Sequence, residues 1–380
     1  MTASDVEVLG GVAQTDPVAW NRLAGDNPFL RHEFLAGLER HGCVGERFGW
    51  LPRPLIARDA GGRLAGAVAL YLKHNTYGEF VFDWAWADAY ARAGKAYYPK
   101  LVAALPYTPA TGPRLLVAPD VDRERVAAAL LEGAIDYARE AGVSSLHWLF
   151  PSPRDLVRLR RSGLLLRMDC HFHWTNRGWH DFDEYLSALS SRKRKKIRQE
   201  RRRVAESGVA IEEYAGDEMS DAQWGVLAEF YASTFRRRGA MPTLNLPFFR
   251  EVGPALGRRV FVVLARHRDR YVAGSIAFAS DDTLYGRHWG CREAFHGLHF
   301  EACYYRGIEY CLRHGLRRFE PGVQGEHKVS RGFLPTPTWS AHWFAHPAFE
   351  TAIADFLGRE RRMIADYCAE LARHSPFKSE

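Results

Sequence analysis

The sequence predicts an α/β protein built from two tandem copies of one unit, each a mixed β-sheet flanked by helices. The chain has 380 residues, more than one ordinary hydrophobic core accommodates, so two domains are expected. An internal repeat gives the stronger reason. Three ungapped blocks recur in the same order: residues 56–78 match 264–286, residues 134–146 match 307–319, and residues 163–174 match 332–343.

Each copy shows the same order of elements. Two apolar runs around a polar turn indicate a β-hairpin, a third strand follows, and a helix then leads to a short strand. These elements fall at 55–72, 77–84, 123–141 and 145–150 in the first copy, and at 260–279, 283–289, 300–314 and 317–320 in the second. The sequence thus predicts a first domain over residues 1–178, with a 35-residue insertion, and a second over residues 179–380, which ends in a helix over 347–373.

Composition narrows the class of protein. Hydrophobic residues make up 47% of the chain, and no apolar run approaches the 18 residues that a membrane helix needs. The first residues are polar and acidic, unlike a signal peptide, so we expect a cytoplasmic protein. The six cysteines form no C-x-x-C pair, and His171, His173 and His342 have the aromatic neighbours of core histidines. We therefore expect no metal site.

Positive charge is concentrated in one predicted helical segment. Residues 192–203 carry nine Lys or Arg and one acid, whereas the whole chain has a net charge of +7. Asp181 and Glu184 have the spacing of a capping box. Ser191 is a suitable cap for a second helix, and Gly208 is a suitable residue after its end.

The first turn of this basic helix carries cations, which the helix dipole repels. Stability would favour acids there, whereas free backbone N–H groups together with cations suit a phosphate. A solvated basic face is the alternative. The predicted phosphate-binding residues are Arg192, Lys193, Arg194 and Lys196.

A second cluster of ionisable groups lies in residues 320–332, directly after the last strand of the second copy. The first copy lacks the corresponding Glu-His-Lys triplet in residues 151–163, as expected if one copy keeps the chemistry. Forming an amide needs a base for the amine proton and donors for the developing oxyanion. A surface loop with incidental charge is the alternative. The candidate catalytic residues are Glu326 or His327 as the base and Lys328 as the oxyanion donor.

Polar and aromatic residues near strand ends are candidates for substrate binding. In the first copy, carboxylates beside aromatic rings could hold an amine or stack a sugar, with a buried strand end as the alternative. In the second copy, an arginine could meet a carboxylate or phosphate. The candidates are Asp83, Trp86, Asp88 and Tyr90 in the first copy, Arg287 and Trp289 in the second, and Gln324 and Arg331 in the loop.

Several longer stretches carry a family resemblance. They include YGEFVFDWAWADAY (77–90), YYPKLVAALPYTPATGPRLL (97–116), LSSRKRKKIRQERR (189–202) and GVQGEHKVSRGFLPTPTWSAHW (322–343). In these the sequence resembles FemAB-like predicted N-acyltransferases, a bacterial family of two tandem GNAT-type folds. The more distant Fem ligases move an aminoacyl group from aminoacyl-tRNA onto the stem peptide of a peptidoglycan precursor, and Lys328 resembles the lysine that follows this strand in them.

The resemblance implies an N-acyltransferase without a bound cofactor, whose donor is acyl-CoA or aminoacyl-tRNA. GNAT enzymes that use acetyl-CoA carry R/Q-x-x-G-x-G/A after their fourth strand, where backbone amides hold the pyrophosphate. Residues 290–300 have no such pattern, so the sequence does not support a CoA donor. An acyl-CoA-dependent N-acetyltransferase is the alternative enzyme. A non-catalytic protein that binds RNA or a cell-wall precursor is the alternative of another class. The expected partners are a phosphate-bearing substrate and, less directly, tRNA.

Overall fold

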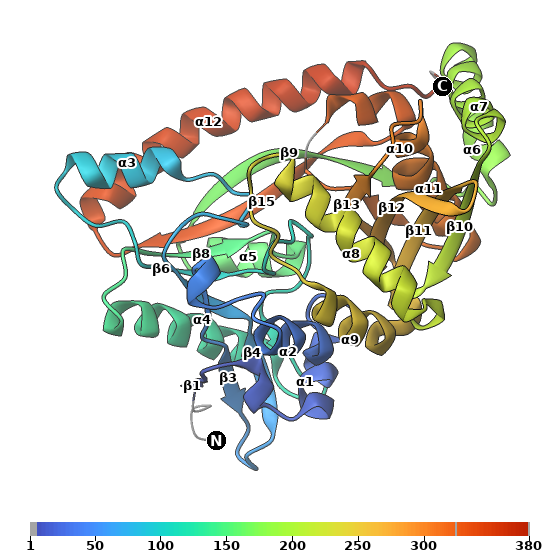
Figure 1. Ribbon diagram of the computed structural model, residues 1–380. Coiled ribbons are helices and arrows are strands. Elements are labelled where there is room, and N and C mark those ends of the chain that lie inside the picture. The colour runs from blue at the N-terminus through green and yellow to red at the C-terminus, as the bar shows by residue number, and fades with distance from the viewer. Residues whose placement is uncertain (1–5, 324, 379–380) are drawn as a thin grey trace. The chain divides into compact units, whose positions relative to one another are not determined.

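The computed structural model describes residues 6–323 and 325–378, which form two compact units (Figure 1). The first unit comprises the residues up to Asp169 together with Pro337–Asp366. The second comprises Cys170–Thr336 together with the residues from Tyr367 onward. The chain therefore passes between the units three times, rather than at the single boundary after residue 178 that we predicted.

The second unit is built on a mixed sheet with the strand order β10–β11–β12–β13–β14–β9. Neighbouring strands from β10 to β13 are antiparallel, whereas β14 is parallel to β13 and antiparallel to β9. The central strands are buried along most of their length, which is typical of a sheet covered on both faces. The bounds are β9 Leu165–Thr175, β10 Val209–Ala215, β11 Val260–His267, β12 Arg270–Ala279, β13 Thr283–Cys291 and β14 Arg318–Glu320.

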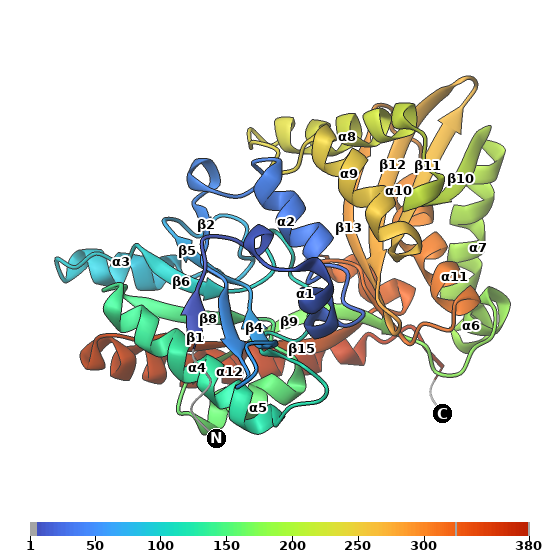
Figure 2. The same cartoon turned by 90° about the horizontal axis from the view of Figure 1, so that it is seen from below.

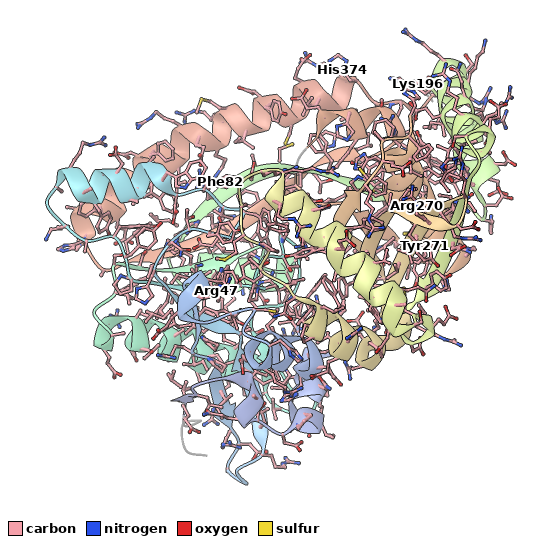
Figure 3. The ribbon with its side chains drawn as sticks, in the orientation of Figure 1. Arg47, Phe82, Lys196, Arg270, Tyr271 and His374 are labelled. Carbon is pink, nitrogen blue, oxygen red and sulfur yellow. The ribbon has the colours of Figure 1, made fainter. Side chains whose placement is uncertain are left out.

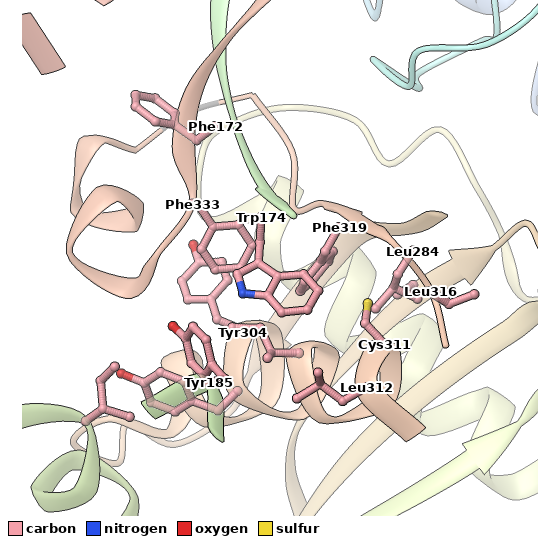
Figure 4. Close-up of a cluster of buried hydrophobic side chains, with 14 of the residues drawn as sticks. Phe172, Trp174, Tyr185, Leu284, Tyr304, Cys311, Leu312, Leu316, Phe319 and Phe333 are labelled. Atoms are coloured by element: carbon pink, nitrogen blue, oxygen red, sulfur yellow. The ribbon is translucent and has the colours of Figure 1, made fainter. Parts of the chain in front are cut away.

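Helices cover both faces of this sheet (Figure 2). Leu264 of β11 lies near Phe230 of α8, whereas the adjacent Val263 belongs to the core under α7 and α11. That core includes Trp174, Phe319 and many other aromatic side chains (Figure 4). The helices are α6 Phe182–Ala188, α7 Ser191–Glu206, α8 Asp221–Arg236, α9 Leu246–Leu256, α10 Leu298–Phe300, the π-helix η5 Glu301–Tyr305, and α11 Arg306–Arg313.

The first unit contains two sheets. One has the order β1–β3–β4–β7, and the other contains β15, β8, β6, β5 and β2 as neighbours. Their bounds are β1 Val6–Val8, β2 Trp50–Pro52, β3 Leu55–Arg58, β4 Leu64–Val68, β5 Leu70–Lys73, β6 Lys100–Ala103, β7 Leu116–Val117, β8 Ser145–Leu149 and β15 Leu334–Phe344. The helices are α1 Pro17–Ala24, α2 His32–Arg40, α3 Trp84–Arg92, α4 Arg123–Glu140, α5 Pro153–Arg161 and α12 Pro347–Arg373.

The helices of the first unit pack on apolar and aromatic side chains. Helices α4 and α5 bury an aliphatic core with β3, β4, β6 and β8. Helices α3 and α12 share a smaller aromatic cluster with the end of β15. Within the described ranges, no helix combines the length and apolar character needed to cross a bilayer.

The predicted repeat is confirmed at the level of topology. In each unit a strand that follows a hairpin runs parallel to the strand after the next helix: β6 with β8 in the first unit, and β13 with β14 in the second. The α/β prediction with two tandem copies is therefore correct, as is the helix predicted over 347–373.

Two expectations for the first copy are wrong. Its third strand is β6, and the segment predicted as that strand, 77–84, is instead a loop that leads into α3. Gly78 and Phe80 both have positive φ, which a strand cannot accommodate. The run predicted as one hairpin strand, 64–72, is also divided between β4 and β5, which belong to different sheets.

Candidate active site

The candidate site of the second unit begins where β13 and β14 separate. Thr283–Tyr285 of β13 pair with Arg318–Glu320 of β14. Beyond these residues β13 continues to Cys291, whereas the segment after β14 forms a loop. At the point of separation, a Cβ on Gly286 would lie 3.2 Å from the Cα of Pro321. Glycine therefore lets the two backbones approach closely before they diverge.

A cavity of about 140 Å³ lies at this separation. Residues from β12, β13 and the helical segment after β13 form its wall. That segment contains the π-helix η5, a distortion that occurs frequently at functional sites. The polar and aromatic residues of the wall are Ser275, Arg287, His288, Trp289, His299, Cys303 and Tyr304. The structure thus places the predicted substrate residues Arg287 and Trp289 on one cavity.

Lys328 is buried beside this cavity. It lies on the short 3-10 helix η6 (Glu326–Arg331) after β14 and is only 2% exposed. Its Nζ donates a hydrogen bond of 2.6 Å to the carbonyl oxygen of Gly322. Burial lowers the pKa of Lys328 to about 8, and the Cys303 thiol on the cavity wall is close enough to influence it. The ammonium is therefore still the main form at pH 7.

The other two predicted catalytic residues lie apart from Lys328. Glu326 is exposed, and its Oε1 accepts a hydrogen bond of 2.7 Å from the Tyr367 hydroxyl. His327 is also exposed, and its Nε2 lies 3.1 Å from the hydroxyl of Tyr304, which lines the cavity. Of the triplet, Lys328 alone is buried, and His327 reaches the cavity through Tyr304.

Arg331 connects the loop to the basic helix. Its guanidinium binds both carboxylate oxygens of Glu200 on α7, at 2.9 and 3.0 Å, and the Tyr305 hydroxyl at 3.0 Å. It also stacks on Phe300, 3.5 Å from the ring centre. These contacts hold the Arg331 guanidinium within the fold, and its predicted role in substrate binding stays a prediction. Gln324, another predicted substrate residue, lies outside the described part of the chain.

The basic helix α7 carries two kinds of cations. In its later turns, Arg198 pairs with Asp183 at 3.2 Å, and Arg201 pairs with Glu301 and Glu309 at 3.0 and 2.7 Å. These charges stabilise the fold.

The first turns of α7 are different. Among the described residues, no carboxylate lies within 4.0 Å of Arg192, Lys193 or Lys195, and Lys196 reaches Glu200 only at that distance. Burial and the neighbouring Lys196, Arg192 and Arg331 lower the pKa of Lys193. Lys196 projects from the outer end of the helix (Figure 3). Unbalanced positive charge is therefore concentrated where we predicted a phosphate.

One detail of this helix is wrong in the sequence prediction. The cap is Ser190 rather than Ser191, and its side chain makes no capping hydrogen bond. Asp181 caps the preceding helix α6 as predicted, but the Glu184 carboxylate bonds back to the amide of His180 instead of completing the capping box.

The predicted substrate residues of the first copy do not share one surface. Asp83, Trp86 and Tyr90 are all buried, the last two in the aromatic cluster under α12. Asp88 is exposed on α3 and pairs with Arg92. The alternative, a buried structural segment, fits the burial of Asp83, Trp86 and Tyr90, but the segment is a loop and helix and not a strand end.

The structure shows instead a buried charged cluster that the sequence analysis missed. Lys100 binds Glu79 at 2.8 Å and also binds Asp83, and Tyr97 donates to the same Asp83 oxygen. The chain of contacts continues from Tyr97 to His147, whose Nδ1 lies 2.5 Å from that of His342 on the adjacent strand. Below we call Lys73, Glu79, Asp83 and Lys100 the charged cluster.

The members of the charged cluster strongly influence one another. Burial, opposed by the charge of Glu79, lowers the pKa of Lys73 to about 7. Burial, opposed by Lys100, raises the pKa of Glu79 to about 7. The lysines at the paired ends of β5 and β6, Lys73 and Lys100, were the available signal, because lysine is rarely buried unless it is paired.

Comparisons with known proteins agree with this architecture. The model of the FemAB-like family, described as peptidoglycan biosynthesis/recognition, matches residues 11–379. No curated protein matches the chain. The C-terminal domain of a putative lysylphosphatidylglycerol synthetase from Agrobacterium fabrum is 12% identical with a TM-score of 0.51, over 91% of this chain and 96% of that one.

Two further solved structures are similar. FemX is 12% identical with a TM-score of 0.50, over 80% of this chain and 91% of its own. A conserved protein of unknown function from Bacteroides thetaiotaomicron is 10% identical with a TM-score of 0.52, over 89% and 99%. At such low identity these likenesses establish the fold alone.

Proposed function

Because the chain belongs to the FemAB-like family, we propose that it is a transferase that moves an acyl or aminoacyl group onto an amine, with Lys328 assisting the reaction. The position of Lys328 carries this proposal. It is a buried ammonium on η6, the short helix that follows β14, beside the cavity that opens where β13 and β14 separate. Strand ends in α/β sheets are where ligands commonly bind.

The proposed reaction starts with a neutral amine that attacks the carbonyl carbon of the activated group. A C–N bond forms, and negative charge develops on the carbonyl oxygen. A cation held in place beforehand stabilises this charge, and in a buried site it acts more strongly than in water. The C–O bond to the leaving group then breaks, and the proton lost by the amine passes to the leaving oxygen. We assign the oxyanion-stabilising role to Lys328.

We further propose that the donor is an aminoacyl-tRNA and the acceptor an amine of a peptidoglycan-type precursor. The charge distribution on α7 supports a phosphate-bearing partner, because Arg192, Lys193 and Lys195 in its first turns lie within 4.0 Å of no described carboxylate, whereas Arg198 and Arg201 further along are paired with carboxylates. A helix N-terminus adds backbone N–H groups to these cations. Lys193 and Arg194 are expected to contribute most.

A transfer assay tests the proposal. Labelled aminoacyl-tRNA and a peptidoglycan precursor with a free amine would be incubated with wild-type protein, with Lys328→Ala, and with the control Arg270→Ala. The Arg270 side chain is 80% exposed at the start of β12 (Figure 3). We expect an amide product from the wild type and the control. Loss of one oxyanion-stabilising group should reduce turnover in Lys328→Ala by about 10²–10³-fold.

Two outcomes would contradict this proposal. Wild-type turnover in a folded Lys328→Ala variant would remove Lys328 from the mechanism. Product formed from an acyl-CoA, but not from aminoacyl-tRNA, would leave the transferase class intact and overturn the donor. Tight RNA binding without product from either donor would favour a non-catalytic binding protein.

A further inference from the structure

The cavity at the separation of β13 and β14 has a wall with one sign of charge. Its volume of about 140 Å³ corresponds to roughly four or five water molecules, at about 30 Å³ each. Arg287 is the permanently charged side chain of the wall, and none of the described residues that line the cavity is Asp or Glu. A ligand inside it is therefore small and meets a guanidinium.

The histidines of the wall add no charge near pH 7. Burial, and then the charge of Arg287, hold the pKa of His288 well below its usual value. Burial lowers the pKa of His299 to about 4, with further contributions from His327, Arg331 and Lys328. The charges of Arg331 and Lys328 therefore act on the pKa of His299 in the same direction as burial.

No group of the wall supplies a compensating negative charge by losing a proton. Burial raises the pKa of the Cys303 thiol far above its usual value, so the thiol stays neutral. The adjacent Lys328 adds a second positive charge at the edge of the cavity. Because charges interact strongly in a site shielded from water, an anion is favoured here and a cation is repelled.

We infer that this cavity holds a carboxylate on a short apolar stem, with the guanidinium of Arg287 as its partner. The inference rests on the transferase function proposed above and narrows it, since either the acceptor or the transferred group then carries this carboxylate. A planar guanidinium suits a carboxylate because it can donate two parallel hydrogen bonds. The stem is accommodated by the apolar part of the wall, which includes Ala277, Leu284 and Phe319.

The same features exclude other groups from the cavity. A whole nucleotide needs a pocket of several hundred Å³ and does not fit. A cationic group, such as the ammonium of a lysyl side chain, would meet Arg287 on the wall and be repelled by like charge. The cavity therefore selects for charge and size together.

Binding of matched probes tests the inference without any turnover. Ligand titrations followed by NMR would compare butyrate, butylamine and inorganic phosphate on the wild-type protein. We expect butyrate to bind at least tenfold more tightly than butylamine and more tightly than phosphate. Arg287→Met should weaken butyrate binding tenfold or more, Arg287→Lys should retain part of it, and the exposed control Arg270→Met should retain all of it.

Equal binding of butylamine and butyrate would overturn the inference, as would unchanged butyrate binding in Arg287→Met. Phosphate that binds as tightly as butyrate would replace the carboxylate with a phosphate as the ligand group. If Arg287→Met does not fold, the wild-type probe series and Arg287→Lys still show whether the cavity prefers a carboxylate. Absence of amide transfer with butyrate selectivity intact would count against the proposed function and not against this cavity assignment.

Discussion

Both units contain buried lysines, and Lys100 of the first unit and Lys328 of the second differ in what surrounds them. Lys100 of the first unit is fully buried between Glu79 and Asp83, whereas Lys328 of the second is 2% exposed and bonds to a neutral carbonyl. Burial lowers the pKa of Lys100, but the two carboxylates more than restore it. Burial lowers the pKa of Lys328 to about 8 without such compensation.

This difference is the basis for proposing a structural role for Lys100 and a role in the reaction for Lys328. A compensated ammonium is held in place by its carboxylates and has little affinity left for a further anion. An ammonium bonded to a neutral carbonyl remains able to stabilise new negative charge, such as an oxyanion. Burial alone therefore does not identify a functional lysine, and the proposal for Lys328 rests on its position beside a cavity and on its neutral hydrogen-bond partner.

The largest effect is expected on the free energy of unfolding when Lys100, the lysine paired with two carboxylates, is replaced. Lys100→Met leaves Glu79 and Asp83 buried next to each other without their cation, which should lower the free energy of unfolding by about 3–5 kcal/mol. Lys328→Met loses one hydrogen bond and should cost about 1–2 kcal/mol. Urea unfolding of both variants measures this difference. Equal losses of unfolding free energy in the two variants would mean that Lys100 and Lys328 contribute to stability in the same way.

The charged cluster should also leave a signature in the pH dependence of stability. The pKa of Glu79 is raised from 4.5 to about 7, so the folded state holds an extra proton between these values. The stability that this proton gives is present below pH 4.5 and is lost as the pH rises through about 7, with a slope of up to about 1.4 kcal/mol per pH unit.

Glu79→Gln should flatten the unfolding free energy between pH 5 and 7 relative to the wild type. The matched control is Asp88→Asn, which removes the same charge from an exposed position on α3 and should leave the slope unchanged. Chemical denaturation at several pH values gives both curves. A slope that persists in Glu79→Gln would assign the proton to another group.

The protonation state of Lys328 should instead determine the pH dependence of turnover. Its ammonium is the active form in the proposed mechanism, so activity should be highest below about pH 8 and fall as the pH rises through that value, by up to tenfold per unit. Rates under single-turnover conditions check this. Activity that rises through pH 8 would show that the neutral amine acts as a base instead.

The smallest effect is expected on α7. Lys193→Ala with Arg194→Ala should weaken binding of a phosphate-bearing donor several-fold, whereas Arg202→Ala, more than two turns further along the helix, should have little effect. Affinity should also fall with added salt as counterions are released. Titrations at two salt concentrations measure both. Equal losses at all three positions would indicate a general basic face.

The sequence was sufficient for features that depend on local pattern or on repetition. The duplication, the basic helix and the helix over 347–373 follow from periodicity and from matched blocks. The buried position of Lys328 is consistent with the expectation that chemistry follows the last strand of the second copy.

The features that were missed depend on contacts between distant segments. Lys73 is the last residue of one short apolar strand and Lys100 is the first residue of another, so in sequence both look like exposed strand ends. Antiparallel pairing of the two strands places these lysines side by side. Their carboxylate partners come from a loop whose aromatic residues resemble a strand. The contact of Arg331 with Glu200, 131 positions apart, could not be predicted either, although it fixes where the Arg331 guanidinium lies.

The central claim is that Lys328 is a buried ammonium that no carboxylate of the described residues compensates, and one titration tests it most directly. The protein would be labelled with ¹³C at the lysine Cε positions, and the signals of Lys328 and Lys100 assigned with Lys328→Arg and Lys100→Arg. We expect the Lys328 signal to titrate near pH 8 while the Lys100 signal stays constant up to pH 10. A Lys328 midpoint near 10.5, or one that coincides with that of Lys100, would contradict the account.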